Sequence, residues 1–182
     1  MKKYALITMV VLIVGALVHP AFSKHTKIIK DKNEYGGISE EETYSKDDKE
    51  YKDGLTRIIE HYDMNKLIQE IESYYHEDHA KKMGVFRKEQ YYENKPFHEP
   101  KLKKAEFFYN DVYAETYGIY KSEIYYDGEA KKKKGVFVFT DKWAKKNNYS
   151  KMEAFYDSKG DTYRRVYYDK ADKVISTEEK KK

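Results

Sequence analysis

A glutamate, a spacer and two adjacent aromatic rings recur along this chain. The stretch KSEIYYDG (Lys121–Gly128) shows the pattern best, and RKEQYYEN and QEIESYYH precede it. Aligned on the charged residue, the units follow one another at steps of 12, 17, 17, 17, 30 and 12 residues; they start at Glu60, Glu72, Glu89, Glu106, Glu123, Glu153 and Arg165. The equal steps of 17 indicate an internal repeat of similar, neighbouring structural units.

The composition of each unit favours a β-strand. Tyr, Phe, Ile and Val suit a pleated, half-buried surface, and turn-forming stretches such as ENKP and DSKGD separate the units. Successive side chains of a strand point to opposite faces, so the doublet places one ring on each face. One face is predicted to carry Ala105/Phe107/Tyr109, Ser122/Ile124/Tyr126, Met152/Ala154/Tyr156 and Val166/Tyr168; the other carries Glu106/Phe108, Glu123/Tyr125, Glu153/Phe155 and Arg165/Tyr167. We expect the first, more apolar face to form the core.

The predicted fold is all-β, an antiparallel meander of hairpins with about seven to nine strands. It forms either a single curved sheet or a partly closed barrel. Residues 62–75 allow two interpretations, because Met64, Leu67, Ile68 and Ile71 also fall at helical spacing. A hairpin is favoured, since it keeps Glu60 and Glu72 within the repeat. A second possible helix, Asp141–Asn148, lies within the 30-residue step and is interpreted as an insertion.

Composition divides the chain into four parts. Residues 1–23 have a basic start, an apolar run of about 15 residues and the small-x-small sequence Ala21-Phe22-Ser23, as in a signal peptide. Residues 24–54 are rich in charge and are predicted to form a flexible leader. Residues 55–176 hold the repeats, and residues 177–182 form a charged tail. We therefore expect an exported protein, periplasmic or extracellular, that meets the membrane only transiently through its signal peptide.

The charge balance and the lack of cysteine limit the function classes. Without Lys2 and Lys3 the chain has 34 basic and 32 acidic side chains, a balance that argues against binding nucleic acid. There is no cysteine, so no disulfide stabilises the fold. The 20 tyrosines must supply much of the buried area, with their hydroxyls at water or a polar partner.

Three segments resemble the hairpin units of bacterial repeat proteins. They are YDMNKLIQ (Tyr62–Gln69), YDSKGDTYRRVYYD (Tyr156–Asp169) and YDKADKVI (Tyr168–Ile175). Each is similar to the "YD, turn, lysine-aliphatic" units of the MORN-like repeats in YwqK-type proteins and of the YD repeats in Rhs-type shells. The resemblance implies an antiparallel sheet of successive hairpins that serves scaffolding, partner binding or encapsulation. It supplies no catalytic residue.

Two groups of residues suggest chemistry without completing a site. His76-Glu77-Asp78-His79 offers ligands for zinc or copper, but it reads as a solvated turn, and metal binding is kept as an alternative. Paired glutamates of the column would suit a glycan hydrolase, although charge pairing between strands explains them as well. No Cys, G-x-S-x-G or phosphate-binding glycine loop is present. We predict no enzyme activity, no catalytic or metal-binding residues and no cofactor.

The remaining candidates are a ladder of rings and a basic run. The sequence leaves open whether the face with the rings is exposed or covered by a second layer or the N-terminal segment. Lys131–Lys134 is predicted to lie in a hairpin loop, and GVFVF (Gly135–Phe139) to form a central strand. The function predicted is binding of a protein or glycan of the cell envelope, or of a partner outside the cell. The candidate contact residues are Tyr74, Tyr91, Phe108, Tyr125, Trp143, Phe155 and Tyr167.

Overall fold

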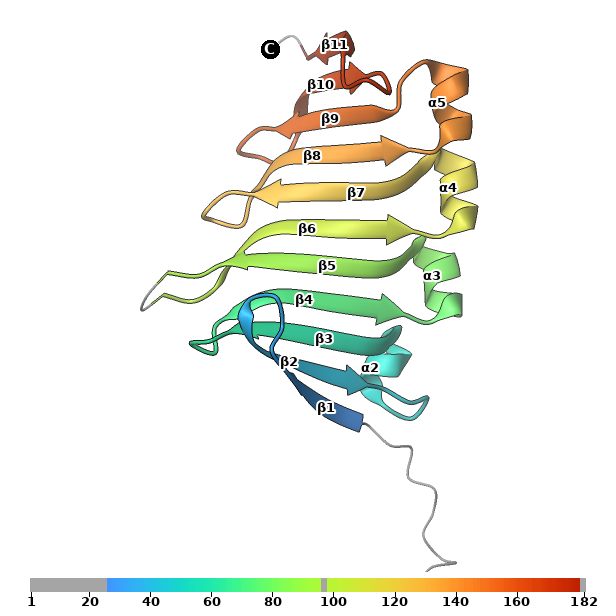
Figure 1. Cartoon of the computed structure of the whole chain (residues 1–182). Coiled ribbons are helices and arrows are strands. Elements are labelled where there is room, and N and C mark those ends of the chain that lie inside the picture. The colour runs from blue at the N-terminus through green and yellow to red at the C-terminus, as the bar shows by residue number, and fades with distance from the viewer. Residues whose placement is uncertain (1–25, 96–97, 181–182) are drawn as a thin grey trace, which may run out of the picture.

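Eleven antiparallel strands form one sheet, and they lie side by side in chain order (Figure 1). The computed structural model describes residues 26–95 and 98–180. The strands are β1 (Thr26–Asp31), β2 (Gly36–Thr43), β3 (Leu55–Asp63), β4 (Ile68–Tyr75), β5 (Val85–Glu93), β6 (Lys101–Tyr109), β7 (Ile119–Tyr126), β8 (Lys132–Phe139), β9 (Lys151–Tyr156), β10 (Thr162–Tyr168) and β11 (Val174–Glu179). The predicted all-β meander in a single curved sheet is confirmed. Because β1 and β11 form its two edges, the described sheet is open rather than closed.

The charged leader predicted at residues 24–54 is wrong for the part that the structure describes. Residues 26–43 form β1 and β2, which extend the sheet beyond the predicted repeat region. Their charges pair across the strands: Lys27 lies 2.7 Å from Glu40, and Lys30 lies 2.6 Å from Glu41. At the other end β11 extends to Glu179, so the first three residues of the predicted charged tail are also strand. The predicted signal peptide, residues 1–23, lies outside the described residues.

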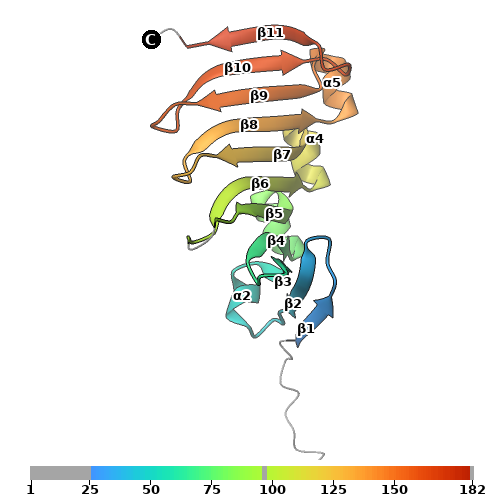
Figure 2. The same cartoon turned by 60° about the vertical axis from the view of Figure 1, so that its left-hand side comes forward.

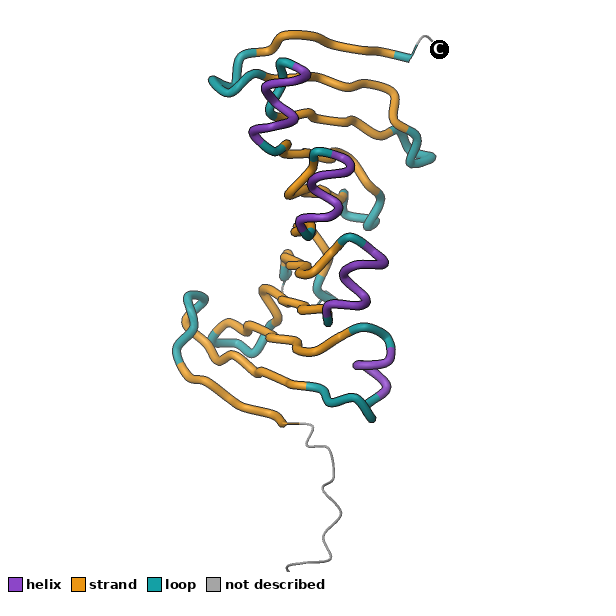
Figure 3. Tube along the Cα trace, turned by 90° about the vertical axis from the view of Figure 1, so that its right-hand side faces the viewer, coloured by secondary structure: helices purple, strands orange, loops and turns teal. Residues whose placement is uncertain are grey.

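Four short helices lie in a row at one end of the strands (Figures 1 and 3). They are α2 (Lys49–Lys52), α3 (Glu77–Met83), α4 (Asp111–Tyr117) and α5 (Asp141–Asn147). The segment His76–His79, predicted as a turn, is the start of α3, and α5 is the third copy of a repeated helix rather than an insertion. Within the described residues, no helix is long and apolar enough to cross a membrane.

The last three helices are built alike. Each follows a capping residue whose side chain accepts a hydrogen bond from the backbone N–H three positions on; the caps are His76, Asn110 and Thr140. Each holds one buried alanine: Ala80, Ala114 or Ala144. Each ends at a residue with positive φ: Gly84, Gly118 or Asn148. The structural repeat is therefore a hairpin plus a helix. From the cap of α3 to that of α4 it spans 34 residues, or two 17-residue steps, and from the cap of α4 to that of α5 it spans 30 residues.

A ring–glycine contact joins each helix to the one before it. The aromatic residue at the third helical position covers the glycine that ends the preceding helix, as Trp143 covers Gly118 and Tyr113 covers Gly84. A Cβ on Gly118 would lie 2.2 Å from Cδ2 of Trp143, and one on Gly84 would lie 2.3 Å from Cδ2 of Tyr113. The backbone N–H of Thr140 also donates to the carbonyl of Gly118 at 2.7 Å. These corners therefore require glycine both for its backbone conformation and for the room it leaves.

The hairpin predicted for residues 62–75 is confirmed, with its turn at residues 63–67. The Asp63 carboxylate accepts hydrogen bonds from the backbone of Asn65 at 2.8 Å and of Leu67 at 3.0 Å. Lys66 then adopts φ of 61°. The same aspartate-capped turn recurs at Asp127, Asp157 and Asp169. The carboxylate holds the turn closed, which explains why three of these turns do without glycine at the positive-φ position.

Two of the repeat units are one residue out of the predicted alignment. Ile59 pairs with Glu72, so Glu60 points to the opposite face. Val166 pairs with Glu153, so Arg165 and Tyr167 also point to the opposite face. Each of these units lies at one end of a 12-residue step across a short hairpin: Glu60 before the first such step and Arg165 after the last. The 17-residue steps, by contrast, keep Glu72, Glu89, Glu106 and Glu123 on one face. A shift of one residue exchanges the two faces of a strand.

The face predicted as the core is not covered by a second layer of the described chain (Figure 2). Its most buried side chains are small, with Ala105 and Ser122 each 1% exposed. The other face buries both acidic and apolar side chains, including Glu106 and Val166. Burial here comes from side chains lying against their neighbours within each face. Long side chains on both faces thus replace a conventional core.

Candidate functional site

One side of the sheet carries a column of directly opposed carboxylates. We call it the glutamate face. Each glutamate pairs in register with that of the next strand from β4 to β7, and Val136 separates the last of these from the acid on β9; the column is Glu72, Glu89, Glu106, Glu123 and Glu153. Like charges directly opposite one another destabilise a sheet. The column therefore depends on the groups beside it.

Rings and cations alternate from strand to strand on both sides of this column, except at Val138 and Glu70. One flanking row reads Arg57, Tyr74, Arg87, Phe108, Lys121, Val138, Lys151 and Tyr168. The other row reads Glu70, Tyr91, Lys104, Tyr125, Lys134, Phe155 and Arg164.

The cations lie on the faces of these rings. The guanidinium carbon of Arg87 is 4.0 Å from the Phe108 ring centre, and Nζ of Lys104 is 4.1 Å from that of Tyr91. Such contacts stabilise both groups. They also cover the flat ring surface on which a sugar would stack. The arrangement therefore favours a partner that contacts ring edges and charges over a stacked glycan.

Lysines and arginines neutralise the acid column. Nζ of Lys121 lies 2.7 Å from Glu106 and 3.1 Å from Glu123, and Lys104 lies 2.5 Å from Glu106. Glu106 is thus held by two cations although it is only 6% exposed. Arg87 pairs with Glu89 at 3.0 Å in the same way. Opposed acids are stable here because cations from both flanking rows pair with them.

Tyrosine hydroxyls supply further hydrogen bonds to the column. Tyr91 donates to Glu89 at 2.8 Å and Tyr125 to Glu123 at 2.6 Å, each two residues along its own strand. Burial and then this hydrogen bond raise the pKa of Tyr125 to about 12. Burial alone would raise the pKa of Glu123, but the bonds from Tyr125 and Lys121 outweigh it and hold that pKa below its usual value.

The raised tyrosine pKa predicts loss of stability in alkali. A folded-state pKa of about 12 against 10 when unfolded means that Tyr125 stabilises the fold fully below pH 10. That contribution falls as the pH rises from 10 to 12, because the unfolded chain loses the proton first. Urea unfolding at pH 8 and pH 11 measures the fall. In Tyr125→Phe we expect a cost of about 1 kcal/mol at pH 8 and a smaller fall between the two pH values; an unchanged fall contradicts the assignment.

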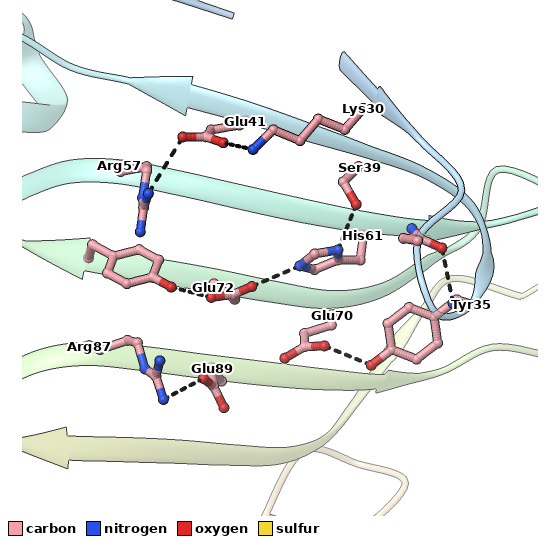
Figure 4. Close-up of polar contacts among 12 residues, drawn as sticks. Lys30, Tyr35, Ser39, Glu41, Arg57, His61, Glu70, Glu72, Arg87 and Glu89 are labelled. Carbon is pink, nitrogen blue, oxygen red and sulfur yellow. Dashed lines mark hydrogen bonds and ion pairs between the residues drawn. The ribbon is translucent and has the colours of Figure 1, made fainter. Parts of the chain in front are cut away.

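A chain of hydrogen bonds crosses strands β2, β3 and β4 at the N-terminal end of this face (Figure 4). Ser39 Oγ lies 2.8 Å from Nδ1 of His61, whose Nε2 lies 2.9 Å from Glu72. The residue types match a hydrolytic triad. Ser39 is only 6% exposed, however, so its hydroxyl is not open to a substrate. The contacts indicate a buried polar network that ties three strands together.

The loop between β1 and β2 covers part of this network. Tyr35 donates to Glu70 at 2.7 Å, and its ring lies 6.3 Å from that of His61 (Figure 4). Burial raises the pKa of Glu70 above its usual value. Tyr35 and Ser39 belong to the segment predicted as a flexible leader, so the sequence interpretation missed them. The Asn33–Gly37 turn, a recognisable hairpin signal, could have indicated them.

Five of the seven candidate contact residues share the glutamate face: Tyr74, Tyr91, Phe108, Tyr125 and Phe155. Tyr167 lies on the opposite face for the reason given above. Trp143 lies on α5, where its ring stacks on Phe139 with centres 6.1 Å apart. The predicted set thus divides between one coherent surface and two separate positions.

Trp143 borders a groove between α4 and α5. The groove has a volume of about 460 Å³ and combines Asp111 and Glu115 of one helix with Lys142 and Lys146 of the next. Because the ring also contacts Gly118 and Phe139, its place in the groove follows from holding consecutive helices together.

His76 and His79, the metal candidates, stabilise the N-terminal end of α3. Nδ1 of His76 accepts a hydrogen bond from the backbone of His79 at 3.1 Å. Their rings stack on Tyr51 and Tyr75. In the described residues, no group of three His, Asp or Glu side chains is arranged to hold a metal ion. Capping and stacking explain both histidines.

No family model, curated protein or solved structure matches the chain. The similarity to hairpin-repeat families therefore rests on the three short YD segments, and the candidate site rests on its own geometry.

Proposed function

We propose that the chain is an exported, non-enzymatic protein that binds a protein partner through the glutamate face. The observation that carries the proposal is that this face is open and continuous from β5 to β10 among the described residues, beyond the part of β4 that Tyr35 covers. Its rings, acids and cations are held by one another. An array that is already fixed loses little conformational entropy when a partner binds.

The region from β7 to β10 is the best-suited part of the face. There Val136 and Val166 take the place of glutamates in the central column, on either side of Glu153, which pairs with Lys134 at 3.3 Å. Phe155 lies beside them. Lys134 and Lys151 surround this apolar part. An apolar centre within a charged rim, with Tyr and Arg enriched, is the usual composition of a protein interface. Since cations cover the ring faces, we favour a protein over a glycan.

The doublets provide a matched crosslinking experiment. A photoreactive phenylalanine analogue placed at Tyr125 or Phe155 lies on the glutamate face, and one placed at Tyr126 or Tyr156 lies on the opposite face. In the full-length chain in its own cells, we expect crosslinks to one defined protein from the first pair only. Equal crosslinking from both pairs, or none from positions 125 and 155, contradicts the proposal.

A charge reversal then tests the interface with the identified partner. Lys134→Glu should weaken binding at least about tenfold, because it replaces a positive charge of the rim with a negative one. Lys133→Glu, one residue away at a bulge, makes the same change of net charge and should leave binding within about twofold. Equal loss in both variants indicates nonspecific electrostatics. Turnover of any substrate by the purified chain would contradict the non-enzymatic part.

A further inference from the structure

Both edges of the sheet are open to another strand. β1 pairs only with β2, and β11 pairs only with β10, so their outer sides face no other described strand. Neither strand contains proline. Apolar side chains are exposed on both, with Ile29 60% and Val174 51% accessible. Natural sheets usually protect such edges, and an unprotected edge is a ready site for strand pairing.

The two edges carry opposite charges. At one end basic β1 lies against acidic β2, where Lys27 contacts Glu40. At the other end basic β10 lies against acidic β11, where Arg164 lies 3.5 Å from Glu179 and Arg165 lies 3.6 Å from Glu178. The sheet therefore ends in a basic strand on one side and an acidic strand on the other.

We propose that copies of this chain associate head to tail, with β11 of one copy pairing with β1 of the next. This junction continues the alternation of basic and acidic strands, from β10 and β11 to β1 and β2 of the neighbour. Pairing of β11 with β11 would bring acidic strands together, and pairing of β1 with β1 would bring basic strands together. Charge complementarity of this kind selects one partner against the others.

The order of the strands fits such a junction. Because neighbouring strands are antiparallel and their number is eleven, β1 and β11 run in the same direction. A copy moved along the sheet thus brings β1 beside β11 as a parallel pair, with both faces continued. Ile29 and Ser176 lie on the same face, opposite the glutamate face. Each edge strand has six residues, so the junction is small and its formation depends on concentration. Such contacts do not close on themselves.

The absence of cysteine makes a site-specific test possible. Two full-length copies with different tags, one Ile29→Cys and one Ser176→Cys, are expressed together and treated with a short bis-maleimide that tolerates a small register offset. We expect crosslinks between the two kinds of copy. A pair of copies carrying Ile29→Cys and Glu129→Cys, in the exposed turn after β7, is the control. Crosslinks mainly between like copies, no crosslinks, or a yield equal to the control overturns the proposal.

Charge exchange between the edges gives an independent test. Lys27→Glu with Lys30→Glu in one copy should lower the crosslinking yield at least about tenfold. Glu178→Lys with Glu179→Lys in the other copy should restore it. The restoration also shows that both variants fold. If the single exchange has no effect, or the second does not restore the yield, the edges do not pair in this way.

Discussion

Replacing Gly118 with alanine is expected to destabilise the protein by about 3 kcal/mol, from a left-handed backbone and an overpacked contact. Gly118 has φ of 75°, and its added Cβ would lie 2.2 Å from the ring of Trp143. The clash cannot be relieved without moving α5 from α4. Urea unfolding measures the loss, and Trp143, the only tryptophan, reports on this contact through its fluorescence.

Gly160 provides a matched control. It has a similar φ of 85°, but an added Cβ would meet nothing within 4 Å. Gly160→Ala should therefore lower the free energy of unfolding only by the cost of the left-handed backbone, about 1 kcal/mol. Adding Trp143→Ala to Gly118→Ala removes the clash, so the two changes together should cost less than the sum of each alone. If Gly118→Ala and Gly160→Ala cost the same, the ring–glycine contact does not join the helices.

The second large effect is expected on removing the Lys121 charge. Lys121→Met keeps most of the volume but leaves Glu106 and Glu123 facing each other with one cation fewer. Since Glu106 is buried, we expect a loss of about 2 kcal/mol at pH 7. The difference from the natural protein should shrink below the usual glutamate pKa of about 4.5, because Lys121 holds the pKa of Glu123 down only in the natural protein and this stabilisation is lost as Glu123 becomes protonated. Equilibrium unfolding at pH 7 and pH 4 measures both values.

Two companion variants separate the charge from its surroundings. Lys121→Met with Glu106→Gln removes one of the two opposed acids, so Glu123 no longer faces a second negative charge, and should recover at least half of the loss. Lys133→Met removes an exposed lysine from β8 and should change the free energy of unfolding by less than about 0.5 kcal/mol. A loss that persists unchanged in the double variant would mean that the ion pairs do not hold the glutamate face together.

The meander was predictable because its signal is local. Aromatic doublets, glutamates at 17-residue steps and YD turns each indicate strand or hairpin without knowledge of the rest of the chain. The glutamate face followed from the same steps, since each keeps its acid in register from Glu72 to Glu123. The hairpin at 62–75 was favoured on this ground, although its apolar residues also fit a helix.

Register and the short helices were harder to predict. Alignment on Glu60 and Arg165 failed because pairing follows the hairpin turn, and one residue of offset reverses the face. Helices of seven residues lack the length that makes helical periodicity visible. Their signal was a repeated group: a capping residue, an acid, an aromatic or histidine, an alanine and a terminal glycine. It becomes clear only when the glycine corners at 84 and 118 are compared.

The N-terminal strands were missed for a different reason. Charge-rich segments are usually solvated, and residues 26–43 contain few apolar side chains. In a sheet of one layer, charged side chains stabilise the fold, because lysine stems cover rings and ammonium groups pair with acids on the next strand. High charge therefore does not argue against order in this architecture.

Asn148 limits how many further hairpin-plus-helix repeats could be added to the sheet. It occupies the corner that glycine holds after α3 and α4, and there a side chain stands where the ring of a following helix would rest. After β10 the chain makes a tight turn instead of another helix. A single residue thus marks the terminal member of the series, and extending the protein by duplicating a segment would first require glycine at this position.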